Sequence, residues 1–293
     1  MSNPVISAVK GVLASAQLLV GTFVLFFGLM VPVALVKLLV PIKPVRKVAD
    51  VLLNFIAETW ILNNNLWVRW VNRKPWHLPD ASHLSRKGWY LVSCNHQSWA
   101  DILVLQRVFN RRIPMLKFFI KHELIYVPIL GLAWWALDFP FMRRKGGASV
   151  AQDLAVARKA CEKFRVIPTS VISFLEGTRY TQDKHDKQKS PYQHLLRPKT
   201  GGIAMALETL GDQFDSLLDV TIVYPKGVPE FHHLLLGQVD DVVVTFREVP
   251  IPKSLQMPED STALAYRAEL QAWMGEMWAR KDAEISELLA KHR

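Results

Sequence analysis

The 293-residue sequence contains only two cysteines, Cys94 and Cys161. They are not spaced as a ligand cluster, which excludes a cysteine-based zinc site and a disulfide framework. Both lie in apolar surroundings, so we interpret them as reduced, buried thiols in a reducing compartment. The chain also lacks an internal repeat and an obvious interdomain linker, and its length is sufficient for one large domain or two small ones.

Acidic residues are scarce relative to basic ones, with 26 Asp and Glu against 36 Lys and Arg, a net charge of +10. This charge attracts nucleic acid, anionic lipid headgroups or phosphorylated substrates, and does not choose among them. No aromatic-rich nucleic-acid motif is present, so no nucleic-acid partner is predicted. A G-x-S-x-G elbow is missing as well, which argues against a thioester or lipid hydrolase.

Hydrophobic residues, in contrast, make up 50% of the chain, and residues 11–36 carry no formal charge. A membrane-spanning helix needs about 20 mostly apolar residues, so this stretch is long enough, with Pro32 expected to kink or end the helix. Lys10 stands alone before it. Four basic residues follow it, which predicts that the chain beyond is cytoplasmic: Lys37, Lys43, Arg46 and Lys47.

A second apolar segment, residues 48–70, includes Asp50 and Glu58 and has an amphipathic pattern. It is compatible with a helix in the membrane interface, with a membrane hairpin formed with the first segment, or with a buried soluble helix. We therefore divide the chain into a membrane-anchoring helical region, residues 1–75, and a catalytic domain, residues 76–293.

Apolar runs that read as strands alternate with amphipathic runs that read as helices through the rest of the chain. The predicted strands are residues 89–94, 169–174, 217–225 and 241–250, and the predicted helices are 98–109, 149–164, 201–210 and 263–292. Residues 113–147 mix short apolar runs with Pro and Gly and predict a strand, a helix and another strand. The charged residues 181–200 predict an exposed loop.

This alternation predicts an α/β fold: a single mixed, largely parallel sheet flanked by helices, with an N-terminal membrane helix or helical hairpin. The last predicted helix has an apolar stripe, which indicates a packing face: Leu270, Trp273, Met274, Met277, Trp278 and Ile285.

The segment "YLVSCNHQSWADILVL", residues 90–105, places His96 and Asp101 at the join between a predicted strand and a predicted helix. Ligands of open α/β sheets bind beyond the carboxyl ends of strands. An imidazole there can take a proton from a nucleophile, while a carboxylate on its other nitrogen fixes the tautomer and stabilises the imidazolium. The pair is a candidate catalytic base.

Two other interpretations of this segment stay open. Ser98 and Asp101 fit an S-x-x-D capping pattern, in which Asp101 only stabilises the start of a helix. Cys94 and His96 are two residues apart on an extended strand, so their side chains point the same way, which is compatible with a nucleophile–base pair. No basic residue lies near Cys94 to lower the pKa of its thiol, which argues against this second reading.

Polar residues follow another predicted strand in "FLEGTRYT", where Gly177 allows a tight turn and Arg179 offers a forked donor set suited to phosphate. A third polar cluster, "FPFMRRKGG", contains Arg143 and Arg144 behind aromatic residues. Taken alone, the first is also compatible with a surface turn, and the second with a solvated face or a lipid-headgroup patch.

The ordered series "NHQSWAD", "FMRR", "FLEGTR" and "VTIVYP", within residues 88–230, resembles the glycerolipid acyltransferase family, in particular the 1-acylglycerol-3-phosphate acyltransferases. That family has a His-x4-Asp motif, an F-I-x-R-type motif, an E-G-T-R motif and a strand ending near a proline, here Pro225. Asp138 stands where the second motif often begins with Gly. The segments "HLLRPKTGG" and "DVTIVYP" look closest to the branch that includes lysocardiolipin-type enzymes.

The resemblance implies that His96 is the general base and Asp101 its orienting partner. It implies a phosphate-binding set for the acceptor: Arg143, Arg144, Glu176, Gly177, Thr178 and Arg179. The implied reaction transfers a fatty acyl group from acyl-CoA or acyl-carrier protein to a lysophospholipid, most simply 1-acylglycerol-3-phosphate, at a membrane in phospholipid biosynthesis.

No metal and no cofactor is implied by the resemblance. The alternatives are an acyltransferase that remodels lysophosphatidylglycerol or lysocardiolipin, and a non-catalytic basic protein that binds membranes.

Overall fold

The computed structural model describes residues 4–72, 74, 76–139, 141–142, 162–165, 167–256, 258 and 263–292. A mixed five-stranded sheet forms its centre, in the order β2-β5-β1-β6-β7. These strands are β1 (Tyr90–Cys94), β2 (Leu116–Phe118), β5 (Ser170–Phe174), β6 (Ser216–Val223) and β7 (Val243–Val249). All neighbouring pairs are parallel except β6 and β7, so the predicted mixed, largely parallel sheet is confirmed.

Among the described residues after the hairpin, the helices are α4 (Ala100–Phe109), α5 (Leu130–Ala136), α7 (Gln182–Gln188), α8 (Gly201–Leu210), α9 (Phe231–Leu235) and α10 (Leu264–Lys291). Short 3-10 helices are η2 (His122–Tyr126), η3 (Glu162–Arg165) and η4 (Lys253–Leu255). A two-stranded parallel ribbon pairs β3 (Ile120–Lys121) with β4 (Phe141–Met142) beside α5.

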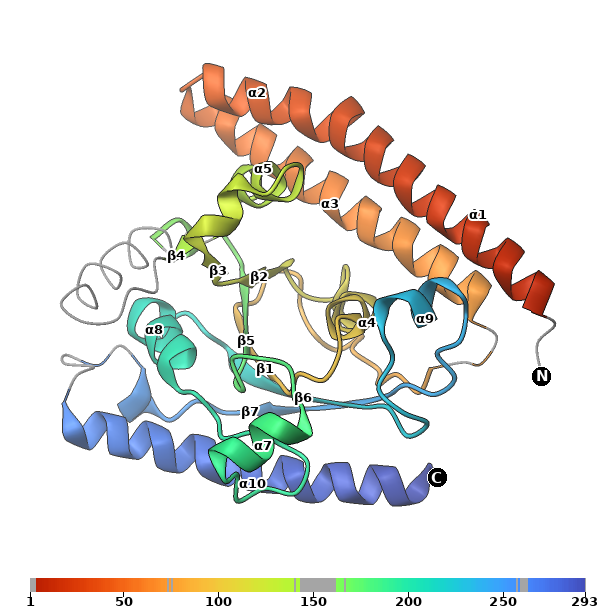
Figure 1. The fold of residues 1–293 in the computed structure, drawn as a ribbon. Coiled ribbons are helices and arrows are strands. Elements are labelled where there is room, and N and C mark those ends of the chain that lie inside the picture. The colour runs from red at the N-terminus through yellow and green to blue at the C-terminus, as the bar shows by residue number, and fades with distance from the viewer. Residues whose placement is uncertain are drawn as a thin grey trace.

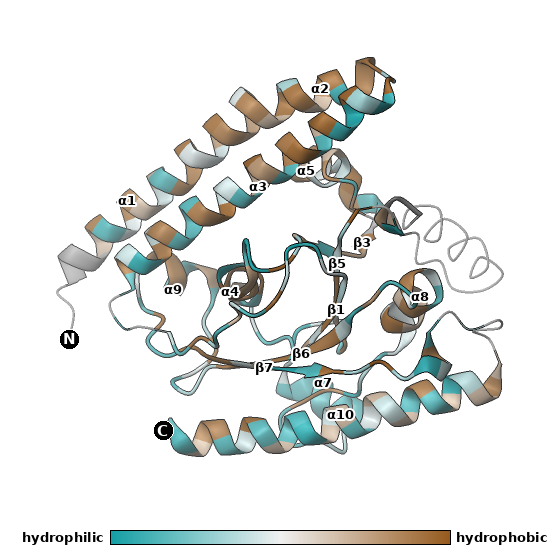
Figure 2. Cartoon of the chain, turned by 180° about the vertical axis from the view of Figure 1, so that it is seen from behind, coloured by the Kyte–Doolittle hydropathy of each residue, from teal (hydrophilic) through white to brown (hydrophobic). Residues whose placement is uncertain are grey.

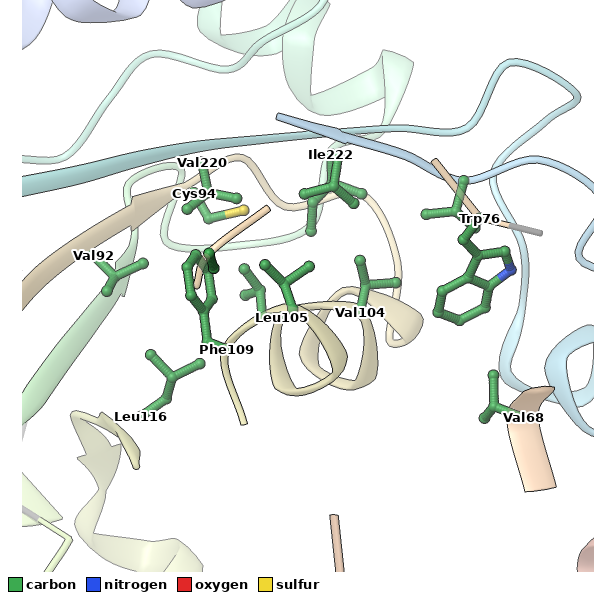
Figure 3. Packing of buried hydrophobic residues seen from close by; sticks show 14 of the residues in the cluster. Val68, Trp76, Val92, Cys94, Val104, Leu105, Phe109, Leu116, Val220 and Ile222 are labelled. Carbon is green, nitrogen blue, oxygen red and sulfur yellow. The ribbon is translucent and has the colours of Figure 1, made fainter. Parts of the chain in front are cut away.

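Helices cover both faces of the sheet (Figure 1). On one face α4 buries Val104, Leu105 and Phe109 against strand residues such as Val92 and Ile222, as Figure 3 shows. On the other face α8 and α10 form a second cluster. The apolar stripe predicted for the last helix lies in this cluster, so its reading as a packing face is confirmed.

The first 36 described residues form one continuous helix, built from α1 (Pro4–Phe23), the π-helical η1 (Val24–Met30) and α2 (Val31–Leu39). Pro32 does not end this helix. It follows a turn in which the Val31 N–H bonds the carbonyl of Phe26, five residues back. Such a π-helical turn accommodates the missing donor of a proline. Within the described chain, residues Ala8–Leu39 are the one helix long and apolar enough to cross a membrane.

Helix α3 (Lys43–Val71) runs back antiparallel to this first helix and completes a helical hairpin (Figures 1 and 2). Interhelical hydrogen bonds join the two: Gln17 Nε2 donates to Asn63 Oδ1 over 2.7 Å, and Trp60 Nε1 donates to Thr22 Oγ1 over 2.9 Å. Polar contacts of this kind hold apolar helices together where no hydrophobic force drives their association. Residues 48–70 therefore form a hairpin with the first segment, while the placement of this hairpin in a membrane stays a prediction.

An ionic cluster closes the turn of the hairpin against α5. The Lys37 ammonium lies 2.7 Å from Asp50 Oδ1 and 2.6 Å from Asp138 Oδ2, and it donates to the carbonyl of Ala136. Asp138 has φ +56°, a conformation that glycine adopts most readily and that Asp tolerates. This explains how an aspartate occupies the position where the resembled family often has glycine.

The predicted order of strands and helices is confirmed wherever the structure describes it, including the strand, helix and strand within residues 113–147. One prediction is wrong: residues 181–200 are not all loop, because α7 forms within them. Thr181 Oγ1 caps it by accepting from the Lys184 N–H, and Lys189 ends it in the left-handed region. Its residues are polar on all sides, so no apolar periodicity signals the helix. Most of the predicted helix 149–164 lies outside the described residues.

Candidate active site

Three neighbouring parallel strands bring the motifs together, because β1 lies between β5 and β6 and their carboxyl ends meet at one edge of the sheet. His96 follows β1, residues 176–179 follow β5, and Tyr224 follows β6. The Asn95 side chain fixes this edge by accepting from the Ile222 N–H and donating to the Ile222 carbonyl, at 2.9 and 2.8 Å. The chain after β1 is thereby tied to β6.

The His96 ring and the Asp101 carboxylate contact one another directly. Nδ1 of His96 lies 2.8 Å from Oδ2 of Asp101, whose side chain is fully buried. Because this nitrogen faces the carboxylate, it carries the hydrogen, and Nε2 is left as the proton acceptor of the neutral ring. The two side chains therefore have the relative arrangement of a base and its orienting acid.

Asp101 also accepts three further hydrogen bonds. Its Oδ2 accepts from the backbone N–H groups of Gln97 and Ser98, at 2.7 and 2.9 Å, and its Oδ1 accepts from the Tyr224 hydroxyl at 2.6 Å. Burial, and after it the Asp101 charge, raise the pKa of Tyr224 well above its ordinary value, so this hydroxyl stays a donor. The contacts that each of the two alternatives for Asp101 requires are both present.

The imidazole is held from a second direction by Phe174, the last residue of β5. The two rings stack with their centroids 4.0 Å apart and their planes 15° from parallel. With Nδ1 fixed and one face covered, rotation of the ring is restricted. The His96 side chain keeps 16% of its surface exposed, and it lines the large cavity described below.

Glu176 differs from its predicted role in phosphate binding. It is fully buried, and its two oxygens accept from the backbone N–H groups of His96 and Leu196 at 2.7 and 3.1 Å. Burial raises the pKa of Glu176 to about 7, against the lowering effect of those two N–H groups. A buried carboxylate that already accepts from the backbone cannot attract a phosphate, so the geometry gives Glu176 a structural role beneath His96.

Gly177, Thr178 and Arg179 lie on the wall of the cavity. Gly177 has φ +65°, and a β-carbon there would lie 3.0 Å from Cδ of Lys199, so this turn favours glycine. Thr178 Oγ1 accepts from the Lys184 ammonium at 2.8 Å. The guanidinium of Arg179 lies over the Trp99 ring, 4.8 Å from its centroid. Arg143 and Arg144 lie outside the described residues, so their predicted phosphate contacts stay predictions.

Cys94 is excluded as a nucleophile by its surroundings. It packs in the core between Val92 and Val220, without exposed surface (Figure 3). Burial raises the pKa of its thiol well above the ordinary value, which suppresses the thiolate that nucleophilic attack requires.

A cavity of about 1920 Å³ opens beside the His96 ring. Its wall is mostly apolar and comes from two parts of the chain that are distant in sequence. The catalytic part supplies residues such as Ile102 and Met205, and the hairpin supplies residues such as Phe26 and Ile61. A volume above the range of most small-molecule pockets, with this lining, suits long hydrocarbon chains.

Four residues of this site were missed by the sequence analysis: Trp99, Phe174, Lys199 and Tyr224. Tyr224 had a usable signal, since it ends an apolar strand next to Pro225. Its contact with Asp101 depends on β6 lying beside β1, which the sequence does not specify. Lys199 had a weaker signal in the basic segment that precedes the two glycines of α8, and the structure places it on the cavity wall near Gly177.

The fold and the site define an α/β enzyme with a histidine–carboxylate pair whose imidazole lines an apolar cavity. The chain belongs to the acyltransferase family, whose model matches residues 77–225, half of the chain. The resemblance drawn from the motifs is thus confirmed at the level of the family.

Individual relatives have low sequence identity to this chain. The chain is 27% identical over 218 residues to 1-acyl-sn-glycerol-3-phosphate acyltransferase delta of Rattus norvegicus, covering 70% of this chain and 54% of that protein. It is 28% identical over 209 residues to lysocardiolipin acyltransferase 1 of Danio rerio, covering 67% and 51%. The chain spans about half the length of the curated relatives it matches.

A solved structure has a similar fold over nearly the whole chain. This is the crystal structure of the 1-acyl-sn-glycerophosphate acyltransferase PlsC from Thermotoga maritima, which is 19% identical, with a TM-score of 0.56 and coverage of 96% of this chain and 98% of that one. At this identity the similarity concerns the fold alone.

Proposed function

We propose that this protein transfers a fatty acyl group from an acyl thioester to the free hydroxyl of a lysophospholipid, in phospholipid biosynthesis. The observation that carries the proposal is the His96–Asp101 pair, whose imidazole lines the large apolar cavity. The acceptor that we favour is 1-acylglycerol-3-phosphate, since the first of the relatives described above has that substrate in its name.

In the proposed reaction, the acceptor hydroxyl lies against Nε2 of His96. The imidazole removes the hydroxyl proton as the oxygen attacks the thioester carbonyl, and Asp101 stabilises the imidazolium. Collapse of the tetrahedral intermediate forms the new ester and breaks the carbon–sulfur bond. The imidazolium returns its proton to the departing thiolate of coenzyme A or a carrier protein, so no covalent enzyme intermediate, metal or cofactor enters the reaction.

The acceptor's phosphate is assigned to Arg179, with Gly177 and Thr178 shaping the turn. Arginine suits this role because its planar fork binds phosphate oxygens in pairs. Lys199, beside Gly177, is a second cation on the same wall. Holding the phosphate would place the hydroxyl near His96, and such positioning is a large part of catalysis. Arg143 and Arg144 keep their predicted part in this set.

The hairpin is assigned to membrane association. Many of its apolar side chains are exposed, among them Leu19, Phe23, Leu39, Phe55 and Leu66. The cytoplasmic placement of the catalytic domain stays a prediction, and the charge asymmetry behind it is smaller than the sequence alone indicated. Lys37 is buried in ion pairs, while Lys43, Arg46 and Lys47 are exposed near the turn of the hairpin. The domain division at residue 75 stays a prediction as well.

A second candidate acceptor is a lysophospholipid with another headgroup. The match to a protein named lysocardiolipin acyltransferase, of nearly the same identity and length, supports it. The two candidates differ in the headgroup that Arg179 must accommodate and not in the acyl-transfer step at His96.

The test is mass spectrometry of the lipids formed when purified protein is given acyl-CoA and a mixture of lysophospholipids. We expect diacylated products from one headgroup class, and a loss of about 10²- to 10⁴-fold in rate for His96→Ala. This variant keeps the backbone bond to Glu176 and loses the ring's contacts with Asp101 and Phe174, so we expect it to fold with a lower melting temperature. An equal turnover in the variant would refute the role of His96.

A further inference from the structure

A second, smaller cavity adjoins the large one, with which it shares Asn110 and Arg111 as wall residues, and does not include His96, Asp101 or Arg179. Its volume is about 310 Å³, at the lower end of the range for small-molecule sites. Three arginines from the end of α4 and the turn after it line the cavity: Arg107, Arg111 and Arg112. Leu62 and Asn65 of α3 form the facing wall.

Arg107 is partly buried, and no ion pair joins it to an acid among the described residues. Its guanidinium lies over the Trp76 ring, 4.5 Å from the centroid, which stabilises a cation without neutralising it. Burial, and after it the charge of Arg69, lower the pKa of Arg107. An arginine held in such a place is stabilised when an anion binds to it.

The charges around this cavity are mostly positive. Arg112 is exposed, and Arg111 lies 3.6 Å from Glu58, whose two oxygens each lie 2.8 Å from Arg86. Asp80 is the acid on the cavity wall, and its carboxylate accepts from the Ser82 N–H and hydroxyl. With three arginines and one acid on its wall, the cavity attracts an anion. Arg111 also has φ +61°, a strained conformation for a residue with a side chain.

The surface beside the cavity indicates which anion. Leu62, on the cavity wall, is one of several exposed apolar residues on α3: Phe55, Leu62, Leu66 and Trp70. A phospholipid whose acyl chains lay along this face of α3 would have its headgroup at the arginines. A planar guanidinium fork matches the oxygens of a phosphate.

We propose that the cavity walled by Arg107, Arg111 and Arg112 binds the phosphate of an anionic phospholipid of the bilayer, at a place separate from the acceptor site. The alternative source of a phosphate is coenzyme A. Neither binding event requires turnover, so the inference can be tested whether or not the protein has the proposed activity.

The test measures binding of the purified full chain to vesicles of phosphatidylcholine, with and without phosphatidylglycerol. The site variant is Arg107→Gln with Arg112→Gln. A matched control, Arg280→Gln with Lys291→Gln, removes the same charge from exposed positions on α10, on the other side of the sheet from α3 (Figure 1). At about fivefold for each basic residue near an anionic surface, we expect roughly a 25-fold loss of phosphatidylglycerol-dependent binding in the site variant. The control should keep wild-type binding.

Equal losses in the two double variants would mean diffuse attraction to the whole basic surface, and no loss in either would mean that the cavity is not used. Both results overturn the proposal. Calorimetric titration with coenzyme A distinguishes the two sources of phosphate. If the site variant loses affinity for coenzyme A and keeps its binding to phosphatidylglycerol, the cavity binds a phosphate of coenzyme A, and the lipid assignment is overturned. If the site variant fails to fold, Arg112→Gln alone should lose binding about fivefold, because Arg112 is exposed.

Discussion

The hydroxyl of Tyr224 donates to Oδ1 of Asp101 over 2.6 Å, on the oxygen that His96 does not use. The two residues are 123 positions apart, and they meet because β6 lies beside β1. One oxygen of the acid thus orients the base, while the other is held by the neighbouring strand.

Tyr224→Phe keeps the ring and removes this donor. A hydrogen bond to a charged group contributes about 1.5–3 kcal/mol, so we expect a loss of this order in the free energy of unfolding and a lower kcat. Tyr266→Phe is the matched control, because the buried Tyr266 hydroxyl has no hydrogen-bond partner in the described chain. Denaturant unfolding and initial rates measure both effects. Equal stability of the two variants would show that the Tyr224 bond contributes nothing.

Asp101→Asn should lower both activity and stability. The amide nitrogen cannot accept from the Gln97 and Ser98 N–H groups, and an Asn that turns its oxygen toward those groups presents its NH2 to Tyr224, which can then no longer donate to it. We expect kcat to fall by about 10²- to 10⁴-fold, because the imidazolium loses its carboxylate. The comparison is with His96→Ala, which should lose a similar rate but keeps the bonds of Asp101 to the Gln97 and Ser98 N–H groups and to Tyr224, so its loss of stability should be smaller. A variant that loses stability and keeps its rate would leave Asp101 only its backbone role.

Glu176 predicts a pH dependence of stability. Its pKa is raised by burial to about 7 in the folded protein, against an ordinary value near 4.5. Between these values the folded protein keeps a proton that the unfolded chain has released, so the free energy of unfolding should decrease as the pH rises from about 4.5 to 7, by up to about 3 kcal/mol. Glu176→Gln should lack this slope. Melting curves of both proteins across that range measure it, and parallel curves would contradict the raised pKa.

Trp99→Ala removes the ring beneath the Arg179 guanidinium. An exposed cation–π contact contributes about 0.5–1 kcal/mol, which predicts an acceptor KM about two- to fivefold higher. The KM for the acyl donor and kcat should stay unchanged, and Trp99→Phe should restore part of the loss. A change confined to kcat would mean that Trp99 acts on His96 and not through Arg179.

The sequence was informative where chemistry follows a buried strand. Apolar runs ending in His96 and in Glu176 could be recognised, and parallel strands bring such ends to one edge. The contacts that each side chain makes at that edge depend on neighbouring strands and loops, which no local sequence pattern specifies. Glu176 turned inward to two backbone N–H groups, and Tyr224 reached Asp101 from a strand whose place in the sheet could not be read from the sequence.

The N-terminal region shows the same limit. Its length and apolarity could be read directly, but its path could not, because the antiparallel return of α3 depends on contacts such as Gln17 with Asn63. In the sequence, Lys37 contributes to the charge asymmetry that predicts a cytoplasmic catalytic domain. In the structure, its charge is neutralised by ion pairs with Asp50 and Asp138.

The cavity beside His96 takes part of its wall from the helices that we assign to the membrane. Removing residues 1–75 to obtain a soluble fragment would therefore do more than detach the protein from lipid. It would remove one wall of the cavity and, under the proposed function, let water reach the acyl thioester. Phe26 is far along the chain from His96 but lines the same cavity, so a substitution there would change the space open to an acyl chain of the proposed substrates.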